Sequence, residues 1–167
     1  MTGSATFRAT TITSGPRALI FSNLWSTTSG TLTIRNLGTA GSIFSPRFFV
    51  GGWTMTRPVV IGNVADTGTA RLDFYNETNT ADLTFSGVIS GPGGIRRTSN
   101  FDGTGGNVIL SGANTYSGGT SNNGGFIGFG SSSLPAGATG AAVTNGPIGI
   151  GNLTINDDSQ IGFFAAG

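Results

Sequence analysis

The sequence predicts an all-β fold: a right-handed parallel β-helix, or solenoid, that is a fragment of a longer rod. Three observations lead to this prediction. Short runs alternate apolar and polar residues, and turns rich in glycine bound each run. Related runs begin near residues 31, 58, 82, 107, 126 and 151, a step of roughly 20–27 residues that is typical of solenoids. No window combines a 3.6-residue apolar stripe with helix caps, so almost no helix is expected.

The alternation locates the individual strands. Leu32 and Ile34 would face one side of a strand, and the threonines between and beside them would face the other. In the same way, Leu83 and Phe85 would face one side and Thr84 the other. The expected strands span residues 30–35, 57–62, 70–75, 82–87, 107–112, 125–130, 151–156 and 160–164. Glycine clusters such as Gly91-Pro-Gly-Gly94 are expected at the corners, where the backbone needs positive φ. A hairpin meander would repeat every 8–12 residues or so and does not fit this spacing.

Composition agrees with tight β-turns around an apolar interior. Glycine accounts for 30 of the 167 residues, and 9% of residues are charged, against about 25% in a typical domain. The 12 phenylalanines and 2 tryptophans argue against disorder. A β-sandwich is the alternative fold, because short strands and turns alone do not distinguish it from a β-helix.

Charge and residue types exclude several functions. All eight basic residues are arginines, the net charge is +1, and only Arg96 and Arg97 are adjacent. No basic face for nucleic acid is expected, and Arg96 and Arg97 are expected to face solvent. The chain has no histidine, cysteine or lysine. This composition excludes Ser-His-Asp and Cys-His catalysis and disulfides, and it removes the commonest zinc ligands. We therefore expect no catalytic residues, no cofactor and no metal.

Residues 82–130 contain the most specific motif of the chain. Ser86-Gly-Val-Ile-Ser-Gly-Pro-Gly-Gly-Ile95 is followed by Leu110-Ser-Gly-Ala-Asn-Thr-Tyr-Ser-Gly-Gly-Thr120. This segment resembles the autotransporter-associated β-strand repeat, found in the secreted passenger regions of bacterial autotransporters and related large surface proteins. The chain departs from the repeat at residues 96–106, expected to form a longer loop, and at residues 121–124, which are polar where the repeat begins an apolar strand.

The resemblance implies a structural and adhesive role without catalysis. Residues 51–167 would form coils around the signature at 82–130, and residues 1–50 degenerate coils or an N-terminal extension. The partners of the chain would be the flanking coils of a parent protein, and host or environmental glycans or proteins. The start, Met1–Thr13, is polar, and the apolar run 18–21 is too short for a signal peptide. No stretch is long enough for a membrane helix, so we expect no membrane insertion of this segment.

We therefore interpret the chain as an interior fragment of a larger protein that is secreted or displayed on the bacterial surface. Coil ends without caps expose strand edges, and such edges favour pairing with another copy. Self-association of the isolated chain is the expected consequence.

The alternative function is a β-helix module that binds or processes polysaccharide. Trp25 and Trp53 are its weak candidates for ligand contact; Tyr75 is a further aromatic, and Tyr116 is expected to be structural. A hydrolase would need two nearby carboxylates, for which Asp73 and its neighbours Glu77 and Asp82 are the candidates. The adjacent acids at 157–158 are expected in a turn. Residues 102–107 have a faint likeness to a calcium-binding repeat, and we interpret them as a solvated corner.

Overall fold

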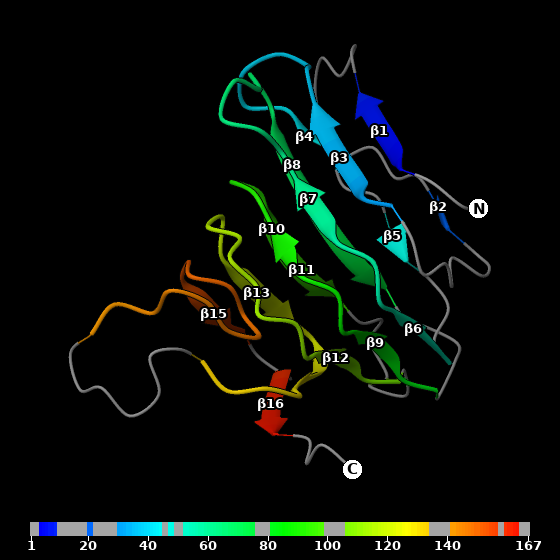
Figure 1. The fold of residues 1–167 in the computed structure, drawn as a ribbon, viewed down its shortest axis with the longest axis vertical. Coiled ribbons are helices and arrows are strands. Elements are labelled where there is room, and N and C mark those ends of the chain that lie inside the picture. The colour runs from blue at the N-terminus through cyan, green and yellow to red at the C-terminus, as the bar shows by residue number, and fades with distance from the viewer. Residues whose placement is uncertain are drawn as a thin grey trace.

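The chain folds entirely into strands and connections over the part that the structure describes. A computed structural model gives residues 4–9, 20–21, 30–44, 47–48, 52–75, 81–98, 106–133, 141–156 and 159–163, and none of them is helical. The strands are β1 (Ala5–Ala9), β2 (Ile20–Phe21), β3 (Leu32–Asn36), β4 (Ile43–Phe44), β5 (Arg47–Phe48), β6 (Trp53–Met55), β7 (Val59–Ile61), β8 (Thr69–Tyr75), β9 (Leu83–Phe85), β10 (Ile89–Ser90), β11 (Gly94–Thr98), β12 (Val108–Leu110), β13 (Thr120–Asn123), β14 (Gly125–Phe129), β15 (Leu153–Ile155) and β16 (Ser159–Phe163). Figure 1 shows β1 near the top and β16 near the bottom, with strands of the sheets lying side by side between them.

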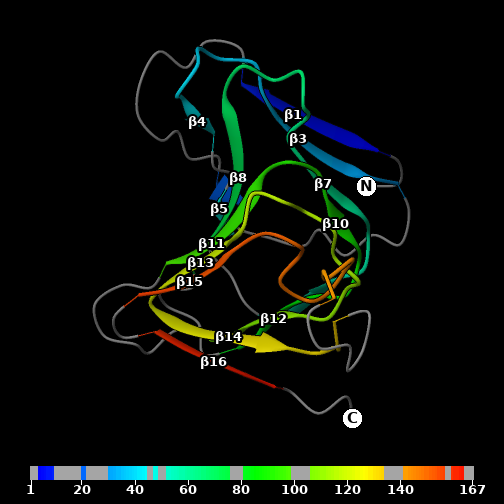
Figure 2. The ribbon, with the colours of Figure 1, turned by 90° about the vertical axis from the view of Figure 1, so that its left-hand side faces the viewer.

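Three sheets of parallel strands make up the structure. Sheet I has the order β1-β3-β7-β10, sheet II the order β2-β5-β8-β11-β13-β15 with β4 also beside β8, and sheet III the order β6-β9-β12-β14-β16. From β7 onward the chain passes from sheet I to sheet II to sheet III and returns to sheet I at β10. Figure 2 shows the sheets on three sides of a common interior. This arrangement confirms the all-β prediction and is compatible with a parallel β-helix.

The register shows how much chain separates paired positions. Leu32 pairs with Val59, and Leu83 pairs with Val108. Both separations agree with the step predicted from the spacing of related runs. The step is shorter between Val108 and Ile127 and longer between Thr120 and Leu153. The predicted step of roughly 20–27 residues therefore holds for the first two pairs, while other pairs, such as Val59 with Ile89, are separated by a longer stretch of chain.

All eight predicted strands occur, at β3, β7, β8, β9, β12, β14, β15 and β16. The prediction of a loop from residue 96 onward is wrong at its start, because Arg96 to Thr98 belong to β11. The polar run after Thr120 is also a strand, β13, whose Asn122 is fully buried. Parallel pairing with β11 supplies the backbone hydrogen bonds of β13, so this strand forms without apolar alternation.

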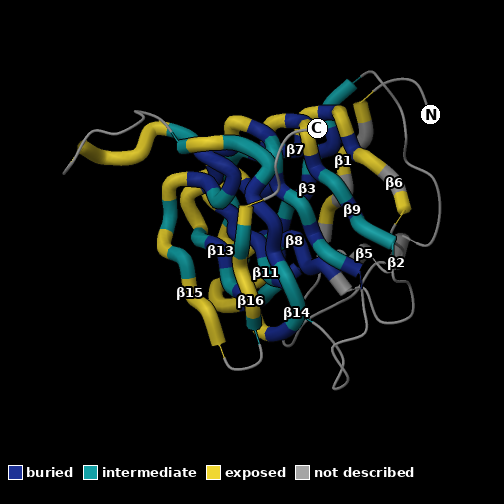
Figure 3. Tube along the Cα trace, turned by 90° about the horizontal axis from the view of Figure 1, so that it is seen from below, coloured by how far each residue is buried: buried dark blue, intermediate teal, exposed yellow. Residues whose placement is uncertain are grey.

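The core consists of columns of side chains stacked across successive strands. In sheet III one column contains Met55, Phe85, Leu110, Phe129 and Phe163, each in register with the next. The first three are buried at 0–1% exposure, Phe129 is 8% exposed, and Phe163 is 84% exposed. Figure 3 shows the buried interior enclosed by more exposed segments. Alternation places every second residue inward, so one face of each strand builds this core.

The adjacent arginines correct one expectation. Arg96 faces outward and pairs with Asp73, but Arg97 is fully buried, so the prediction that both face solvent is wrong. Neighbouring residues of a strand point to opposite faces, which forces one of any two adjacent side chains inward. Arg97 donates to the carbonyl oxygens of Thr98 (2.8 Å) and Gly106 (3.2 Å). Burial lowers the pKa of its guanidinium to about 10.

Buried asparagines link one circuit of the chain to the next. Asn36 donates from Nδ2 to the carbonyl oxygens of Ser42 and Thr69, both at 3.0 Å. Asn114 accepts from the Ile89 N–H at 2.8 Å and donates to the Pro147 carbonyl oxygen at 2.7 Å. These side chains supply hydrogen bonds to backbone groups of their own and of neighbouring circuits.

Candidate functional site

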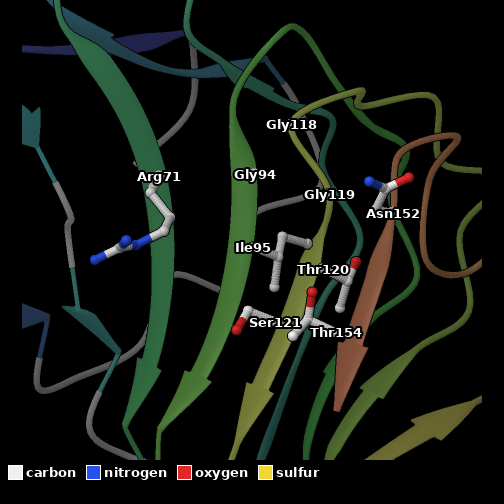
Figure 4. A pocket seen from close by; sticks show the side chains of 9 residues that line it. All are labelled: Arg71, Gly94, Ile95, Gly118, Gly119, Thr120, Ser121, Asn152 and Thr154. Carbon is white, nitrogen blue, oxygen red and sulfur yellow. The ribbon is translucent and has the colours of Figure 1, made fainter. Parts of the chain in front are cut away.

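A groove on the outer face of sheet II is a candidate site in the described part of the chain. It has a volume of about 340 Å³ and lies over β8, β11, β13 and β15, with residues Arg71, Gly94, Ile95, Gly118, Gly119, Thr120, Ser121, Asn152 and Thr154 along it (Figure 4). Three of these residues are glycines, so little side-chain bulk covers the backbone at its centre. The groove therefore exposes backbone between polar side chains.

Close backbone approach explains the glycines of the groove. A Cβ atom on Gly94 would lie 2.7 Å from the Gly118 carbonyl oxygen, and one on Gly118 would lie 2.5 Å from the Gly93 carbonyl carbon. Neither position can carry a side chain without moving the backbone. These glycines come from the Gly-Pro-Gly-Gly and Ser-Gly-Gly-Thr motifs, and the groove follows from the same tight stacking of corners.

The polar side chains of the groove are mainly neutral. Asn152 and Thr154 are exposed, and Ser121 is half-buried and donates to Asn123 Oδ1 at 2.6 Å. Figure 4 shows the Arg71 side chain extending away from Gly94 and Gly119. Hydroxyl and amide groups such as these suit hydrogen bonding to a hydroxyl-rich ligand.

Asp73 pairs with two arginines beside the groove and offsets one of their two positive charges. Its carboxylate is fully buried and accepts from Arg71 Nε at 2.7 Å, and it also pairs with Arg96 on the neighbouring strand. The two ion pairs give the buried carboxylate the hydrogen-bonded partners that a buried polar group requires. Asp73 is therefore committed to a structural network.

The other described carboxylates also have structural partners. Asp66 is held by Arg35 and by the backbone N–H groups of Asn36 and Asn63. Partial burial raises the pKa of the Asp66 carboxyl, but the hydrogen bonds and charge of Arg35 outweigh it, and the pKa lies below its usual value. Asp82 accepts from the Asn107 side chain at 2.8 Å.

Asp73 and Asp82, two of the three candidate acids for a hydrolase, bond different partners in the structure. Glu77 lies outside the described residues, as do Asp102 of the calcium-like segment and the acids at 157–158. Within the described residues no group of three or more potential metal ligands occurs. Asp66, Asp73 and Asp82 each bond a different set of partners.

Tyr116 has a structural position, in agreement with the sequence interpretation. It is fully buried, and its hydroxyl hydrogen-bonds the Thr120 hydroxyl, which in turn donates to the Ile148 carbonyl oxygen. A buried ring cannot serve as a platform for a sugar. Trp25 lies outside the described residues. The structure gives the backbone of Trp53 in β6 and of Tyr75 at the end of β8, but it does not describe their side chains.

The chain is expected to lose stability through Tyr116 as the pH rises above about 10. Burial raises the pKa of the Tyr116 phenol, and its bond to Thr120 offsets only part of this rise. The unfolded chain therefore releases the phenolic proton at a pH where the folded chain retains it, and linkage lowers the free energy of unfolding. Arg97, whose pKa burial lowers, acts in the opposite direction above about pH 10.

A comparison of Tyr116→Phe with wild type isolates the tyrosine, because the Arg97 contribution is common to both proteins. Denaturant titrations from neutral pH to pH 11 or so should show the wild type losing stability relative to Tyr116→Phe once the pH exceeds the ordinary tyrosine pKa of about 10. Equal pH profiles for the two proteins would show that Tyr116 does not ionise differently on unfolding.

No protein-family model, curated protein or solved structure matches the chain. Among the described residues, no helix has the length and apolar character needed to cross a membrane.

Proposed function

We propose that the chain is a non-catalytic scaffold segment, a right-handed parallel β-helix within an exported bacterial surface protein of the autotransporter-passenger type. Stacked coils would hold adhesive regions away from the cell. Folding of such coils outside the membrane would also discourage backsliding during export, which is an implication of the resemblance in residues 82–130.

The observation that carries this proposal is the role of the motif residues. Asn114 bonds backbone groups of the preceding and following circuits, and Tyr116 fills the core. Gly94 and Gly118 permit close stacking of corners, and Thr120 bonds both Tyr116 and the next circuit. Every one of these motif residues serves the stacking of one circuit on another, which is what a rod requires of a repeat.

A pair of deletions tests the scaffold role. Removing residues 83–107 joins Asp82 directly to Val108, the first residue of β12. Because Leu83 and Val108 are register partners, β12 then takes the place of β9 after Asp82. This in-phase deletion shortens the stack by one circuit. Removing residues 83–95 instead joins Asp82 to Arg96 and places a sheet II strand where a sheet III strand belongs.

Each deletion is placed between a signal peptide and a translocating barrel, and surface display is measured by antibody and protease accessibility. The scaffold proposal predicts display of the in-phase deletion near wild type and a several-fold loss for the out-of-phase deletion. Full display of the out-of-phase deletion would contradict it, because stacking would then contribute nothing to export.

The second candidate function is binding of a neutral polysaccharide, which the groove on sheet II favours. Thr154→Ala and Asn152→Ala should then weaken binding to a glycan found in a broad panel, because both side chains are exposed in the groove. Val64→Ala, at an exposed position between β7 and β8, is the matched control. A panel without any binder would remove this candidate.

A further inference from the structure

Two arginines and one aspartate form a charged cluster on the outer face of sheet II, beside the groove. Arg71 lies two residues before Asp73 on β8, and Arg96 is the register partner of Asp73 on β11. We call Arg71, Asp73 and Arg96 the charged cluster. Two guanidinium groups paired with one carboxylate give these three side chains a net charge of +1. Asp73 is the only acidic residue in β8, β11, β13 and β15.

The positive charges of the cluster reach solvent, whereas the negative charge does not. The side chains of Arg71 and Arg96 are 21% and 23% exposed, and the side chain of Asp73 is 0% exposed. Among the described residues Arg96 donates only to Asp73, although a guanidinium has five N–H donors. A ligand that approaches the charged cluster therefore meets cationic N–H groups before it meets a carboxylate.

Strand register connects the charged cluster to the groove. Arg96 is the register partner of Ser121, and Ser121 is the register partner of Thr154. Neighbouring strands lie about 4.8 Å apart, so these three positions form a row that crosses β11, β13 and β15. Figure 4 shows Ser121 and Thr154 on adjoining strands, with Arg71 and Asn152 at opposite sides of the groove. We call Ser121, Asn152 and Thr154 the neutral end of the groove.

The charged cluster and the neutral end suit different groups of one polymer. Guanidinium groups bind carboxylate and sulfate oxygens well, because a charge-assisted hydrogen bond is roughly twice as strong as a neutral one. Hydroxyl and amide side chains exchange hydrogen bonds with sugar hydroxyls. The glycines between the two ends leave the backbone uncovered, so an extended chain can lie across the strands. An acidic polysaccharide carries both kinds of group along one chain.

We propose that the groove on sheet II binds an acidic polysaccharide, with a carboxylate or sulfate group on the arginines of the charged cluster and sugar hydroxyls on the neutral end. This inference rests on the second candidate function, polysaccharide binding in the groove, and it makes the ligand anionic rather than neutral. A nucleic acid fits this face less well, because its binding depends on neutralising many phosphates, and the charged cluster contains two arginines. Export of the chain is not required.

Three forms of one polymer separate the effect of charge from that of the sugar. Dextran is uncharged, carboxymethyl dextran carries carboxylates, and dextran sulfate carries sulfate esters on the same backbone. In isothermal titration calorimetry we expect the full chain to bind at least one charged form about tenfold more tightly than dextran, with an affinity that falls as salt is added. The charged form that binds more tightly identifies the anionic group as carboxylate or sulfate.

Variants on sheet II locate the binding site. Arg96→Gln leaves Asp73 paired with Arg71 and should weaken binding of the charged polymer about tenfold, the effect of losing one charge-assisted hydrogen bond. Thr154→Glu puts a negative charge on an exposed position of the row and should also weaken binding, whereas Thr154→Arg should strengthen it. Arg8→Gln, on an exposed residue of β1 in sheet I, is the matched control that removes one positive charge elsewhere.

Circular dichroism and denaturant unfolding check that each variant folds like wild type. The two Thr154 substitutions leave the charged cluster intact, so they test the site even where Arg96→Gln lowers stability. Their opposite signs at one position give a readout that a general loss of folding would not produce.

Several outcomes would overturn the proposal. Equal affinity for dextran and its charged forms would do so while leaving the second candidate function in place with a neutral ligand. Absence of binding to both charged forms would also contradict it. Equal losses in Arg96→Gln and Arg8→Gln would show attraction by overall charge instead of a site. Single-stranded DNA bound as tightly as the charged dextrans would show that the groove does not select a polysaccharide.

Discussion

Phe85→Ala is expected to lower the free energy of unfolding by about 3–5 kcal/mol, the cost of deleting a fully buried aromatic side chain. Phe85 lies in the middle of the sheet III column, between Met55 and Leu110, and is 1% exposed. Its ring also packs against Phe74 of sheet II, with centroids 4.8 Å apart. The cavity left by the substitution would therefore remove contacts between sheets II and III as well as between successive strands of sheet III.

Phe163→Ala is the matched control, because it removes the same side chain from the exposed end of the same column. Its cost should stay below about 1 kcal/mol, as for an exposed position. Urea unfolding followed by circular dichroism, at a concentration where the chain does not associate, gives both values. Similar losses for the two variants would contradict the placement of Phe85 at the centre and of Phe163 at the end of the stack.

Asn114→Ala is expected to cost about 2–4 kcal/mol, because it leaves two buried backbone groups without a partner at about 1–3 kcal/mol each. The Ile89 N–H loses its acceptor and the Pro147 carbonyl oxygen loses its donor. These groups belong to the circuits before and after Asn114, so the substitution loosens three successive layers. A fully buried asparagine is thus as important here as an apolar core residue.

Asn156→Ala is the control for this substitution. Asn156 is exposed and donates to Asn123 Oδ1 at 2.6 Å, a bond that water can replace. We expect a change within about 0.5 kcal/mol. A loss for Asn114→Ala no greater than that for Asn156→Ala would mean that Asn114 does not bridge the circuits.

The strand positions could be predicted from the sequence because two signals coincide there. Alternation marks the buried face, as at Leu83 and Phe85, and glycine-rich turns mark the ends of each run. The spacing of related runs indicated parallel stacking with two or three strands per turn, and the structure has three parallel sheets. Strands without alternation escaped prediction: β13 contains Thr-Ser-Asn-Asn and forms because β11 and β15 pair with it on both sides.

The candidate site could be predicted only in part. The glycine motifs could be recognised as corners from the sequence. The groove forms where particular corners lie side by side, and the strand register determines which corners these are. Arg97 shows most clearly what the sequence does not reveal, because two adjacent arginines are expected to face solvent. Strand alternation buries one of the two, and only the register with Phe74 and Asn122 reveals which.

The absence of cysteine from the chain permits a direct test of the stacked register. Thr84 of β9 and Ile109 of β12 are distant in sequence but are register partners on the outer face of sheet III. Parallel neighbours lie about 4.8 Å apart, within the Cα range of a disulfide. In Thr84→Cys/Ile109→Cys we expect rapid intramolecular oxidation in the folded protein. Thr84→Cys/Thr154→Cys, with its cysteines on different sheets, should not form this bond. Equal crosslinking of the two variants, or none in the first, would contradict the stack.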